Sequence, residues 1–470
     1  MRLARTTLVH FGSRAAISVT GFVATLYIAQ VLGADVLGRY VIVVGFLYWL
    51  NVPNQAVASA LTKRLSEGER QGKLLAAGGL VAGAIVAMVC LALVATGNVL
   101  DRRVTPGLST FLIPMVVGSA LFVPVRAALK GDKRVGTAGL VGAVDRTLRT
   151  ALQIGLIVLG YSLGGLVVGH VGGLVLSGAI GLYLLGPSPS VPSTEDVRSL
   201  LSYARYAWLG AIKTRAFGWM DTIVLAFFVQ ASLVGIYEVA WNLASLLAMI
   251  SVSVSQTLFP ELSELDTEDR YDQIHHYLDE GMVFVGIFAV PGFFGALVVG
   301  PEVLEIYSPE FRQGFVVLLV LIVAKLVAAF NSQFLGAINA VDRPDVAFRV
   351  NSAFIVANLV LNVVLVYRFG WYGAAVATAL SAVLSLGLSY YALSGLIGRP
   401  SVPYAEFLRQ GVAAIAMAAV LAVVSRAVPS NNYTTVLLVL FGATVYTALL
   451  VAISGRVRSK SVGLVDSVLA

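Results

Sequence analysis

Long apolar stretches alternate with short polar connections along most of the 470-residue chain. A membrane-spanning helix needs about 20 consecutive, mostly apolar residues, and many of these stretches have that length. The strands of a membrane barrel would instead show segments of about 10 residues with alternating polarity. We therefore predict an all-α integral membrane protein of about 14 transmembrane helices, over residues 8–32, 37–60, 75–97, 107–129, 137–160, 163–185, 203–229, 233–258, 280–300, 314–336, 347–367, 371–396, 405–426 and 433–454.

The composition agrees with a protein embedded in lipid. Hydrophobic residues make up 58% of the chain and charged residues only 12%, with a mean hydropathy of +0.88. A soluble domain carries roughly 25% charged residues. The net charge of +7 is explained by loop bias and by basic residues within the helices, so we expect no nucleic-acid partner.

Lysine and arginine are concentrated on one side of the predicted helices, and this side is expected to face the cytoplasm. The arrangement places both termini in the cytoplasm of a multi-pass protein in the cell (plasma or inner) membrane. The connections on the richer side contain 19 lysines and arginines, and those on the opposite side contain six. The richer set is Arg2, Arg5, Lys63, Arg64, Arg70, Lys73, Arg126, Lys130, Lys133, Arg134, Arg198, Arg270, Arg343, Arg349, Arg399, Arg409, Arg456, Arg458 and Lys460. The opposite set is Arg39, Arg102, Arg103, Arg312, Arg368 and Arg426.

The chain contains an internal repeat. Residues 34–40 (ADVLGRY) resemble residues 231–237 (ASLVGIY) at an offset of 197. Ala127, Asp132 and Lys133 match Ala337, Asp342 and Arg343 at an offset of 210. Six helices separate the two copies, so both copies insert in the same direction and form parallel repeats, one of the known transporter plans. The fold class that we predict is therefore two parallel six-helix repeats plus two C-terminal helices.

Four segments are expected from this repeat. Residues 1–186 form an N-terminal six-helix lobe, and the proline-containing stretch 187–202 is a cytoplasmic linker. Residues 203–400 form a C-terminal six-helix lobe, and residues 401–470 add two helices and a cytoplasmic tail.

Basic residues at membrane depth are the main candidates for function. A charge near the bilayer centre costs at least ~2.5–3.5 kcal/mol, so such residues usually face a cavity or a partner. A water-filled cavity that receives an anion would explain the excess of positive charge. For Arg14, Arg205, Lys213 and Arg215 the alternative is that the side chain reaches the lipid headgroups. The candidate cations are Arg14, Arg146, Arg149, Arg205, Lys213, Arg215 and Lys325, all but Arg205 being predicted to bind substrate.

Few acidic residues lie at the same depth. Asp145 and Arg149 are four residues apart, so they can pair on one helix face, either as a structural ion pair or beside a substrate that Arg146 and Arg149 contact. Asp221 and Glu238 are candidates either for pairing with Lys213 or Arg215 or for ion coupling.

Amide side chains in the spans are expected mainly to join helices, and His10 and His170 are interpreted as packing residues.

Motifs that are typical of several kinds of enzyme are missing from the sequence. The sequence has no G-x-x-x-x-G-K-[ST] loop for a nucleotide phosphate and no nucleophile–base arrangement. We therefore expect neither an enzyme nor a cofactor or metal site.

Several motifs together resemble those of a known family. They are Ala29-Gln30-Val31-Leu32-Gly33, Gly38-Arg39-Tyr40, Met220-Asp221, Val234-Gly235-Ile236-Tyr237, Phe259-Pro260-Glu261-Leu262-Ser263, Ile338-Asn339-Ala340-Val341-Asp342-Arg343-Pro344 and Gly370-Trp371-Tyr372-Gly373. The chain is similar over nearly its whole length to the Wzx-like polysaccharide flippases of the multidrug/oligosaccharidyl-lipid/polysaccharide exporter superfamily. This resemblance implies that the two six-helix repeats form a MATE-like fold. It departs at Gln30, where the family often has arginine.

The resemblance implies translocation of a lipid-linked oligosaccharide by alternating access, for surface glycan biosynthesis, with a cationic lumen that receives the phosphate of the lipid carrier. Expected partners are this substrate, membrane lipids and glycan assembly enzymes, with the protein acting as a monomer. The alternatives are an ion-coupled antiporter of drugs or cations and a glycan polymerase or ligase. A cationic substrate would favour acidic lumen residues, and the short exterior loops disfavour an enzyme.

Overall fold

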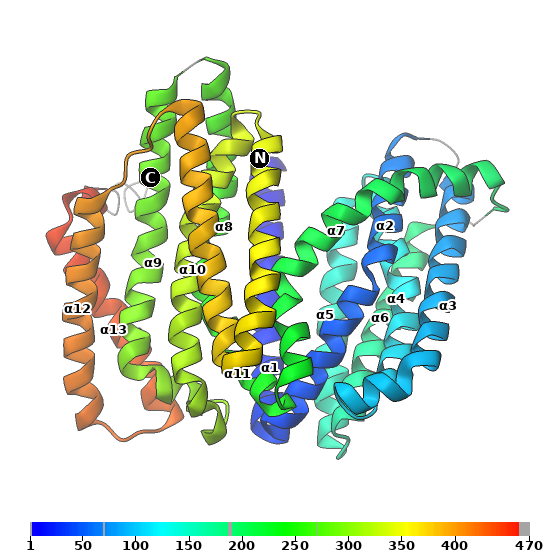
Figure 1. The fold of residues 1–470 in the computed structure, drawn as a ribbon, viewed down its shortest axis with the longest axis horizontal. Coiled ribbons are helices and arrows are strands. Elements are labelled where there is room, and N and C mark those ends of the chain that lie inside the picture. Colours follow the sequence, from blue (N-terminus) through cyan, green and yellow to red (C-terminus); the bar gives the residue numbers. More distant parts are fainter. Residues whose placement is uncertain (1, 69–70, 187–189, 269, 460–470) are drawn as a thin grey trace. The chain divides into compact units, whose positions relative to one another are not determined.

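The computed structural model describes residues 2–68, 71–186, 190–268 and 270–459. Within these ranges it does not describe the side chains of residues 2–20, 71, 209–211, 213–214, 216–217, 250–254, 256–257 and 260. The described residues form helices and no strand (Figure 1): α1 (Arg2–Leu50), α2 (Val52–Ser66), α3 (Gln71–Arg103), α4 (Leu108–Gly131), α5 (Val135–Val158), α6 (Leu163–Leu185), α7 (Thr194–Phe228), α8 (Ala231–Thr267), α9 (Tyr271–Glu305), the 3₁₀ helix η1 (Pro309–Gly314), α10 (Phe315–Ala340), α11 (Pro344–Ile397), α12 (Tyr404–Ala427) and α13 (Asn432–Ile453).

The helices coincide with the stretches predicted from hydropathy. Helix α1 contains the first predicted span and the start of the second, with a kink at Gly33 (φ 78°), and α2 continues the second span. Helix α11 contains two predicted spans, which are separated at Gly370 (φ 57°). Among the described residues, ten helices are long and apolar enough to cross a membrane. The predicted class of all-α integral membrane protein is therefore confirmed.

The chain divides into two compact units, Met1–Gly235 and Ile236–Ala470. Helix α7 lies in the first unit, and α8 begins in the first unit and continues into the second. Helix α7 begins within the predicted linker, where the Ser193 side chain and the Asp196 side chain cap each other's backbone N–H groups at 3.2 and 2.8 Å. The predicted division into lobes, linker and added helices stays a prediction.

The core of the first unit lies among α2 to α7, and residues such as Leu61, Ala128 and Leu200 are fully buried there. Amide and hydroxyl groups join helices beside this core. The Ser119 hydroxyl of α4 donates to the Asn51 side chain at 2.7 Å, as expected for amides inside a membrane.

Two backbones approach each other closely within the first unit. A methyl group added at Gly38 of α1 would overlap the carbonyl oxygen of Ala231 at the start of α8, and one added at Gly235 would overlap the carbonyl oxygen of Ala34. Ala34 and Gly38 are four positions apart in the sequence, as are Ala231 and Gly235. Small residues with this spacing let membrane helices cross at a short distance. Both pairs occupy matching positions of the predicted repeat, at the offset of 197.

The second unit has one core among α8–α11, around Ile274, Ala337 and Leu393, and another among α9, α12 and α13. In the first of these, Asn331 of α10 donates to the Ser385 hydroxyl at 2.9 Å and accepts from the Ser389 hydroxyl at 2.6 Å.

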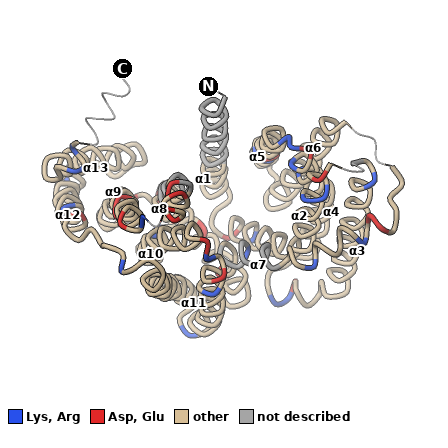
Figure 2. The backbone as a smooth tube through the Cα atoms, turned by 90° about the horizontal axis from the view of Figure 1, so that it is seen from above, with Lys and Arg blue, Asp and Glu red and all other residues tan. Residues whose placement is uncertain are grey.

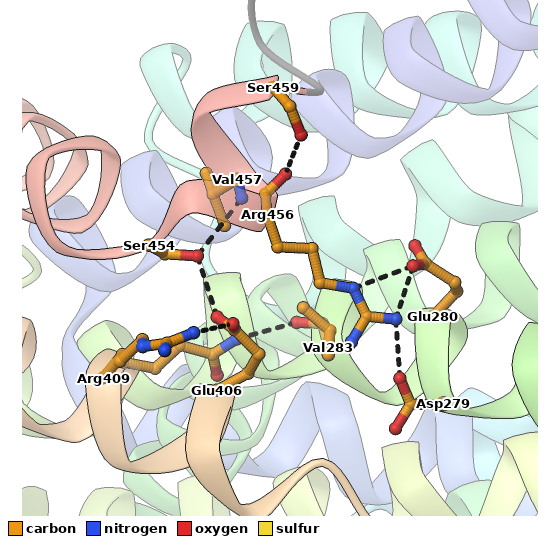
Figure 3. A network of polar contacts seen from close by, with 10 residues as sticks. Asp279, Glu280, Val283, Glu406, Arg409, Ser454, Arg456, Val457 and Ser459 are labelled. Carbon is orange, nitrogen blue, oxygen red and sulfur yellow. Dashed lines mark hydrogen bonds and ion pairs between the residues drawn. The ribbon is translucent and has the colours of Figure 1, made fainter.

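A network of charged residues joins the ends of α9, α12 and α13 (Figure 3). Arg456 pairs with Asp279 at 2.6 Å and donates from Nε to Glu280 at 2.8 Å. The buried Glu406 carboxylate pairs with Arg409 and accepts from the Ser454 hydroxyl at 2.8 Å. The two C-terminal helices are therefore attached to α9 by specific polar contacts as well as by apolar packing.

The turns that follow α4 and α10 repeat each other. Lys133 (φ 59°) and Asp342 (φ 52°) both adopt the left-handed conformation. In the same turns Arg134 N–H donates to the Leu129 carbonyl at 2.9 Å, and Arg343 N–H donates to the Ile338 carbonyl at 3.1 Å. The structural offset is therefore 209, and the predicted offset of 210 is wrong by one residue. It matched Asp132-Lys133 with Asp342-Arg343, but in the structure Lys133 corresponds to Asp342 and Arg134 to Arg343.

Candidate functional site

Charged residues are few along the apolar helices (Figure 2), and the predicted cations differ in their surroundings. Arg146, Arg149 and Arg215 belong to the first unit and Lys325 belongs to the second. The side chains of Arg14 and Lys213 lie outside the described residues. Arg205 is exposed on α7, with its guanidinium 4.7 Å from the centre of its neighbour Tyr206.

The predicted pair on α5 is present and buried. Arg149 Nη2 lies 2.6 Å from Asp145 Oδ2, and only 8% and 6% of the two residues is exposed. Arg146, next in sequence to Asp145, is half-buried. The ion pair is thus a feature that helical spacing alone predicted correctly.

A second polar group lies beside this pair and links α1, α5 and α6. The Tyr40 hydroxyl accepts from the Gln153 side-chain amide at 2.7 Å and lies 2.8 Å from His170 Nδ1. Gln153 also donates to the Leu166 carbonyl at 2.9 Å. His170, interpreted from the sequence as a packing residue, therefore has a polar partner that lies 130 residues away in the chain.

Glycines of α6 set the position of these polar side chains. A methyl group at Gly173 would lie 2.8 Å from Arg149 Cβ, and one at Gly169 would lie 2.7 Å from Gln153 Cγ. Because α6 packs directly against the backbone of α5, Gln153 lies within reach of α1, where it meets Tyr40.

Arg215 reaches the same region from α7. Its guanidinium lies 4.5 Å from the centre of the Tyr48 ring of α1, and the Trp219 ring lies 4.8 Å from that ring. Stacking of a guanidinium on an aromatic face is a favourable contact. Tyr48 also interacts electrostatically with Arg149, so it interacts with an arginine of α5 and with an arginine of α7.

Arg126 of α4 is a further cation of this region. A methyl group at Gly142 of α5 would lie 3.3 Å from the guanidinium carbon of Arg126, and Arg126 interacts electrostatically with Asp145. The sequence pattern did not single out Arg126, because it lies near the end of the predicted span 107–129 and counts there as part of the following basic connection. We call these neighbouring charged residues the arginine cluster, which consists of Arg126, Asp145, Arg146, Arg149 and Arg215.

In the second unit, Lys325 has surroundings of its own. Its ammonium nitrogen lies 3.3 Å from the centre of the Trp241 ring of α8. Glu238, one turn before Trp241, accepts from the Asn242 side chain at 3.2 Å and interacts electrostatically with Lys325. Within its own unit Glu238 therefore meets Lys325, a cation that was not among its predicted partners.

The remaining predicted acid, Asp221, is buried on α7 with 8% of its surface exposed. No cluster of three or more His, Cys, Asp or Glu suited to a metal ion occurs among the described residues. The roles predicted for the individual side chains, in binding substrate or coupling to an ion, stay predictions.

The sequence matches two families of known proteins. Residues 3–266 match the family described as "Polysaccharide biosynthesis protein", and residues 193–444 match the family described as "Lipid II flippase MurJ". Among curated proteins, the "Probable flippase AglR" of Haloferax volcanii is 31% identical, with 98% of each chain covered. The "Probable low-salt glycan biosynthesis flippase Agl15" of the same organism is 26% identical, with 91% of each chain covered.

Solved structures share the fold. The lipid II flippase MurJ in an inward closed conformation has a TM-score of 0.77 at 14% identity, covering 94% of this chain and 97% of MurJ. An inward-facing multidrug MATE transporter has a TM-score of 0.65 at 12% identity, covering 83% of this chain and 98% of the transporter. The predicted MATE-like fold is thereby confirmed.

Proposed function

The chain belongs to the family of polysaccharide biosynthesis proteins, and on that premise we propose that it is a flippase for a lipid-linked oligosaccharide. It is a multi-pass membrane protein, and its relatives AglR and Agl15 are named as flippases rather than as enzymes. The cargo is an oligosaccharide joined by phosphate or pyrophosphate to a polyprenyl lipid. The protein moves it from the cytoplasmic to the outer leaflet of the cell membrane for the assembly of surface polysaccharide or glycan.

The arginine cluster is the observation that carries this proposal at the level of residues. Arg126 of α4 and Arg149 of α5 both interact with Asp145, and Arg149 and Arg215 of α7 both interact with Tyr48. A phosphate headgroup must leave water to cross the membrane, and charge-assisted hydrogen bonds replace its hydration. Arginine suits this task because its planar guanidinium can grip phosphate with two parallel bonds.

The substrate crosses the membrane by alternating access between two parallel repeats. The repeated turns after α4 and α10 and the paired motifs at the offset of 197 support such a repeat. With the basic connections in the cytoplasm, both termini are cytoplasmic. Membrane lipids and the enzymes that assemble the glycan are the partners that this function requires, and a single chain contains both repeats, so the protein can act as a monomer.

The energy source is a gradient or the membrane potential, because the sequence has no nucleotide-binding loop. Moving one charge through 100 mV is worth ~2.3 kcal/mol. Asp221 and Glu238 are the candidate residues for coupling to an ion. Glu238 is favoured by its position beside Lys325 and Asn242, because an ion that binds there would change the charge next to Lys325.

Deletion of the gene tests the function directly. We expect the complete lipid-linked oligosaccharide to accumulate and the matching surface glycan to disappear, since assembly continues while export stops. Mass spectrometry of extracted lipids measures the first effect, and analysis of surface glycans measures the second. Restoration of both by a plasmid copy is the control, and an unchanged lipid-linked pool with normal surface glycan would refute the proposal.

An antiporter of drugs or cations is the alternative, because the MATE transporters share the fold. The arginine cluster disfavours it, since positive residues repel a cationic substrate. A deletion strain with normal glycans and increased sensitivity to cationic drugs would favour this alternative over the flippase.

A further inference from the structure

The buried ion pair of the arginine cluster is incompletely satisfied. One oxygen of Asp145, Oδ2, accepts from Arg149, while Asp145 Oδ1 and Arg149 Nε have no hydrogen-bond partner among the described residues. Both residues are more than nine-tenths buried. Nε of the neighbouring Arg126 likewise has no hydrogen-bond partner in the described part of the chain.

An ion pair of this kind contributes little to the stability of the fold. A buried ion pair offsets the cost of removing two charges from water only when its geometry is excellent and its remaining polar atoms are hydrogen-bonded. Arginine and a carboxylate can make two parallel bonds, but only one bond joins Asp145 and Arg149. The pair therefore leaves hydrogen-bonding capacity on both partners.

The charges of the region are also unbalanced. Arg126, from α4, and Arg149 both act on Asp145, and Arg146 adds a third positive charge next to it in sequence. Asp145 thus neutralises part of the positive charge that a phosphate would meet. A carboxylate and a phosphate oxygen are the same kind of acceptor for a guanidinium, so the two compete for Arg149.

We propose that Asp145 is an internal counter-ion that competes with the substrate's phosphate for Arg149, so that it lowers the affinity for the headgroup and speeds its release. This inference rests on the proposed function. In the absence of substrate the carboxylate holds Arg149. When the headgroup arrives, the phosphate takes the guanidinium, and the carboxylate recovers it as the headgroup leaves.

The consequence is that Asp145 lowers the affinity for the phosphate and raises the rate of transport. Without a competing acid, several arginines at low dielectric would hold a phosphate strongly, and a transporter that does not release its cargo is slow. The acid is placed one helical turn from Arg149, so the exchange of partners needs only side-chain movement. Asp145 acts on the substrate through Arg149 and is therefore a positioning residue.

The test is binding of a defined anionic lipid by the purified full-length protein. The probe is geranylgeranyl pyrophosphate, with uncharged geranylgeraniol as the control ligand. We expect Asp145→Asn to bind the pyrophosphate about tenfold more tightly than the wild type does, and to translocate lipid-linked oligosaccharide more slowly in vesicles. Affinity for geranylgeraniol should not change.

A matched control is available in the same unit. Asp35 and Arg39 of α1 form another aspartate–arginine pair with the same spacing, 2.9 Å apart, but this pair is exposed. Asp35→Asn should leave both affinity and translocation unchanged. If it tightens binding as much as Asp145→Asn does, the effect is one of overall charge and the counter-ion role is refuted.

A charge-balanced variant keeps the test decisive if Asp145→Asn does not fold. Asp145→Asn combined with Arg149→Gln removes both charges and leaves no buried charge without its partner. Because Arg149 is the guanidinium that the phosphate takes, this variant should lack the tighter binding of Asp145→Asn and should bind the pyrophosphate more weakly than the wild type does. Wild-type affinity in the double variant would show that Arg149 does not hold the headgroup, which contradicts the proposal.

Two failures are distinguishable. If the wild type binds the pyrophosphate and Asp145→Asn binds it no more tightly, the counter-ion role is wrong and the proposed function is unaffected. If the wild type binds pyrophosphate and geranylgeraniol equally, no anion site exists, and both the counter-ion and the headgroup site are refuted.

Discussion

At the scale of residues, substitutions of Arg215 can test the effect of its charge separately from the effect of its packing. Its guanidinium stacks on Tyr48, and the proposed function assigns its charge to the phosphate of the substrate. A lysine at this position keeps the charge but loses the planar stack and the two-bond grip on phosphate.

Arg215→Gln should reduce translocation of lipid-linked oligosaccharide at least tenfold, because a charge-assisted bond to the headgroup is lost, while the amount of protein in the membrane is unchanged. Arg215→Lys should retain more activity than Arg215→Gln. Flux in vesicles measures the first quantity and immunoblotting the second. Arg103→Gln, at the exposed end of α3, is the control and should have no effect. Equal flux for Arg215→Gln and the wild type would show that the charge is not used.

The sequence predicted the parts of the site that lie within one helical turn and missed those that join distant segments. Asp145 and Arg149 are four residues apart, so their pairing followed from helical geometry. The contacts of Tyr40 with Gln153 and of Arg215 with Tyr48 join residues of different helices. Nothing in a local pattern specifies which helices are neighbours, and this is why Tyr48 and Trp241 were not proposed as partners of Arg215 and Lys325.

At the scale of elements, the crossing of α1 with the start of α8 depends on two glycines. Gly38 and Gly235 each contact the opposite backbone within the first unit. Overpacking a tightly packed contact costs ~1–3 kcal/mol, and a backbone oxygen has less freedom to move away than a side chain has.

Gly38→Ala should therefore lower the midpoint of thermal unfolding in detergent by several degrees and reduce flux. Gly21→Ala, in the same helix, is the matched control, because a methyl group there would meet no atom within 4 Å. The control should unfold at the wild-type temperature or slightly above it, since alanine favours a helix over glycine. A Gly38→Ala protein as stable as Gly21→Ala would show that the close crossing is not required.

The positions of the helices were largely predictable, since each predicted span falls on a helix. The errors concern where helices begin and how two consecutive spans are joined. Helix α7 begins earlier than hydropathy indicated because a polar capping box at Ser193 starts it before its apolar part. The kinks at Gly33 and Gly370 join predicted spans into α1 and α11. A glycine in the left-handed conformation redirects the chain without a polar loop, so hydropathy does not reveal how the two spans are joined.

At the scale of the whole molecule, orientation can be tested without any assay of transport. The turn containing Lys133 should lie in the cytoplasm and the end of α3 at Arg103 on the opposite side. Reporters fused after each residue should therefore give opposite locations, with alkaline phosphatase active only at Arg103 and a cytoplasmic fluorescent protein active only at Lys133. The same location for both reporters would refute the predicted topology.

The most direct measurement of the proposed flippase activity is translocation of a purified lipid-linked oligosaccharide in vesicles that contain only this protein. The labelled lipid is placed in both leaflets, and a glycosidase that does not cross membranes reports how fast the inner pool becomes accessible. With an imposed membrane potential or ion gradient, we expect rapid digestion of the whole pool, and a large reduction in rate for Arg215→Gln. Digestion that stops at the outer leaflet, as in protein-free vesicles under every gradient, would contradict the proposed function.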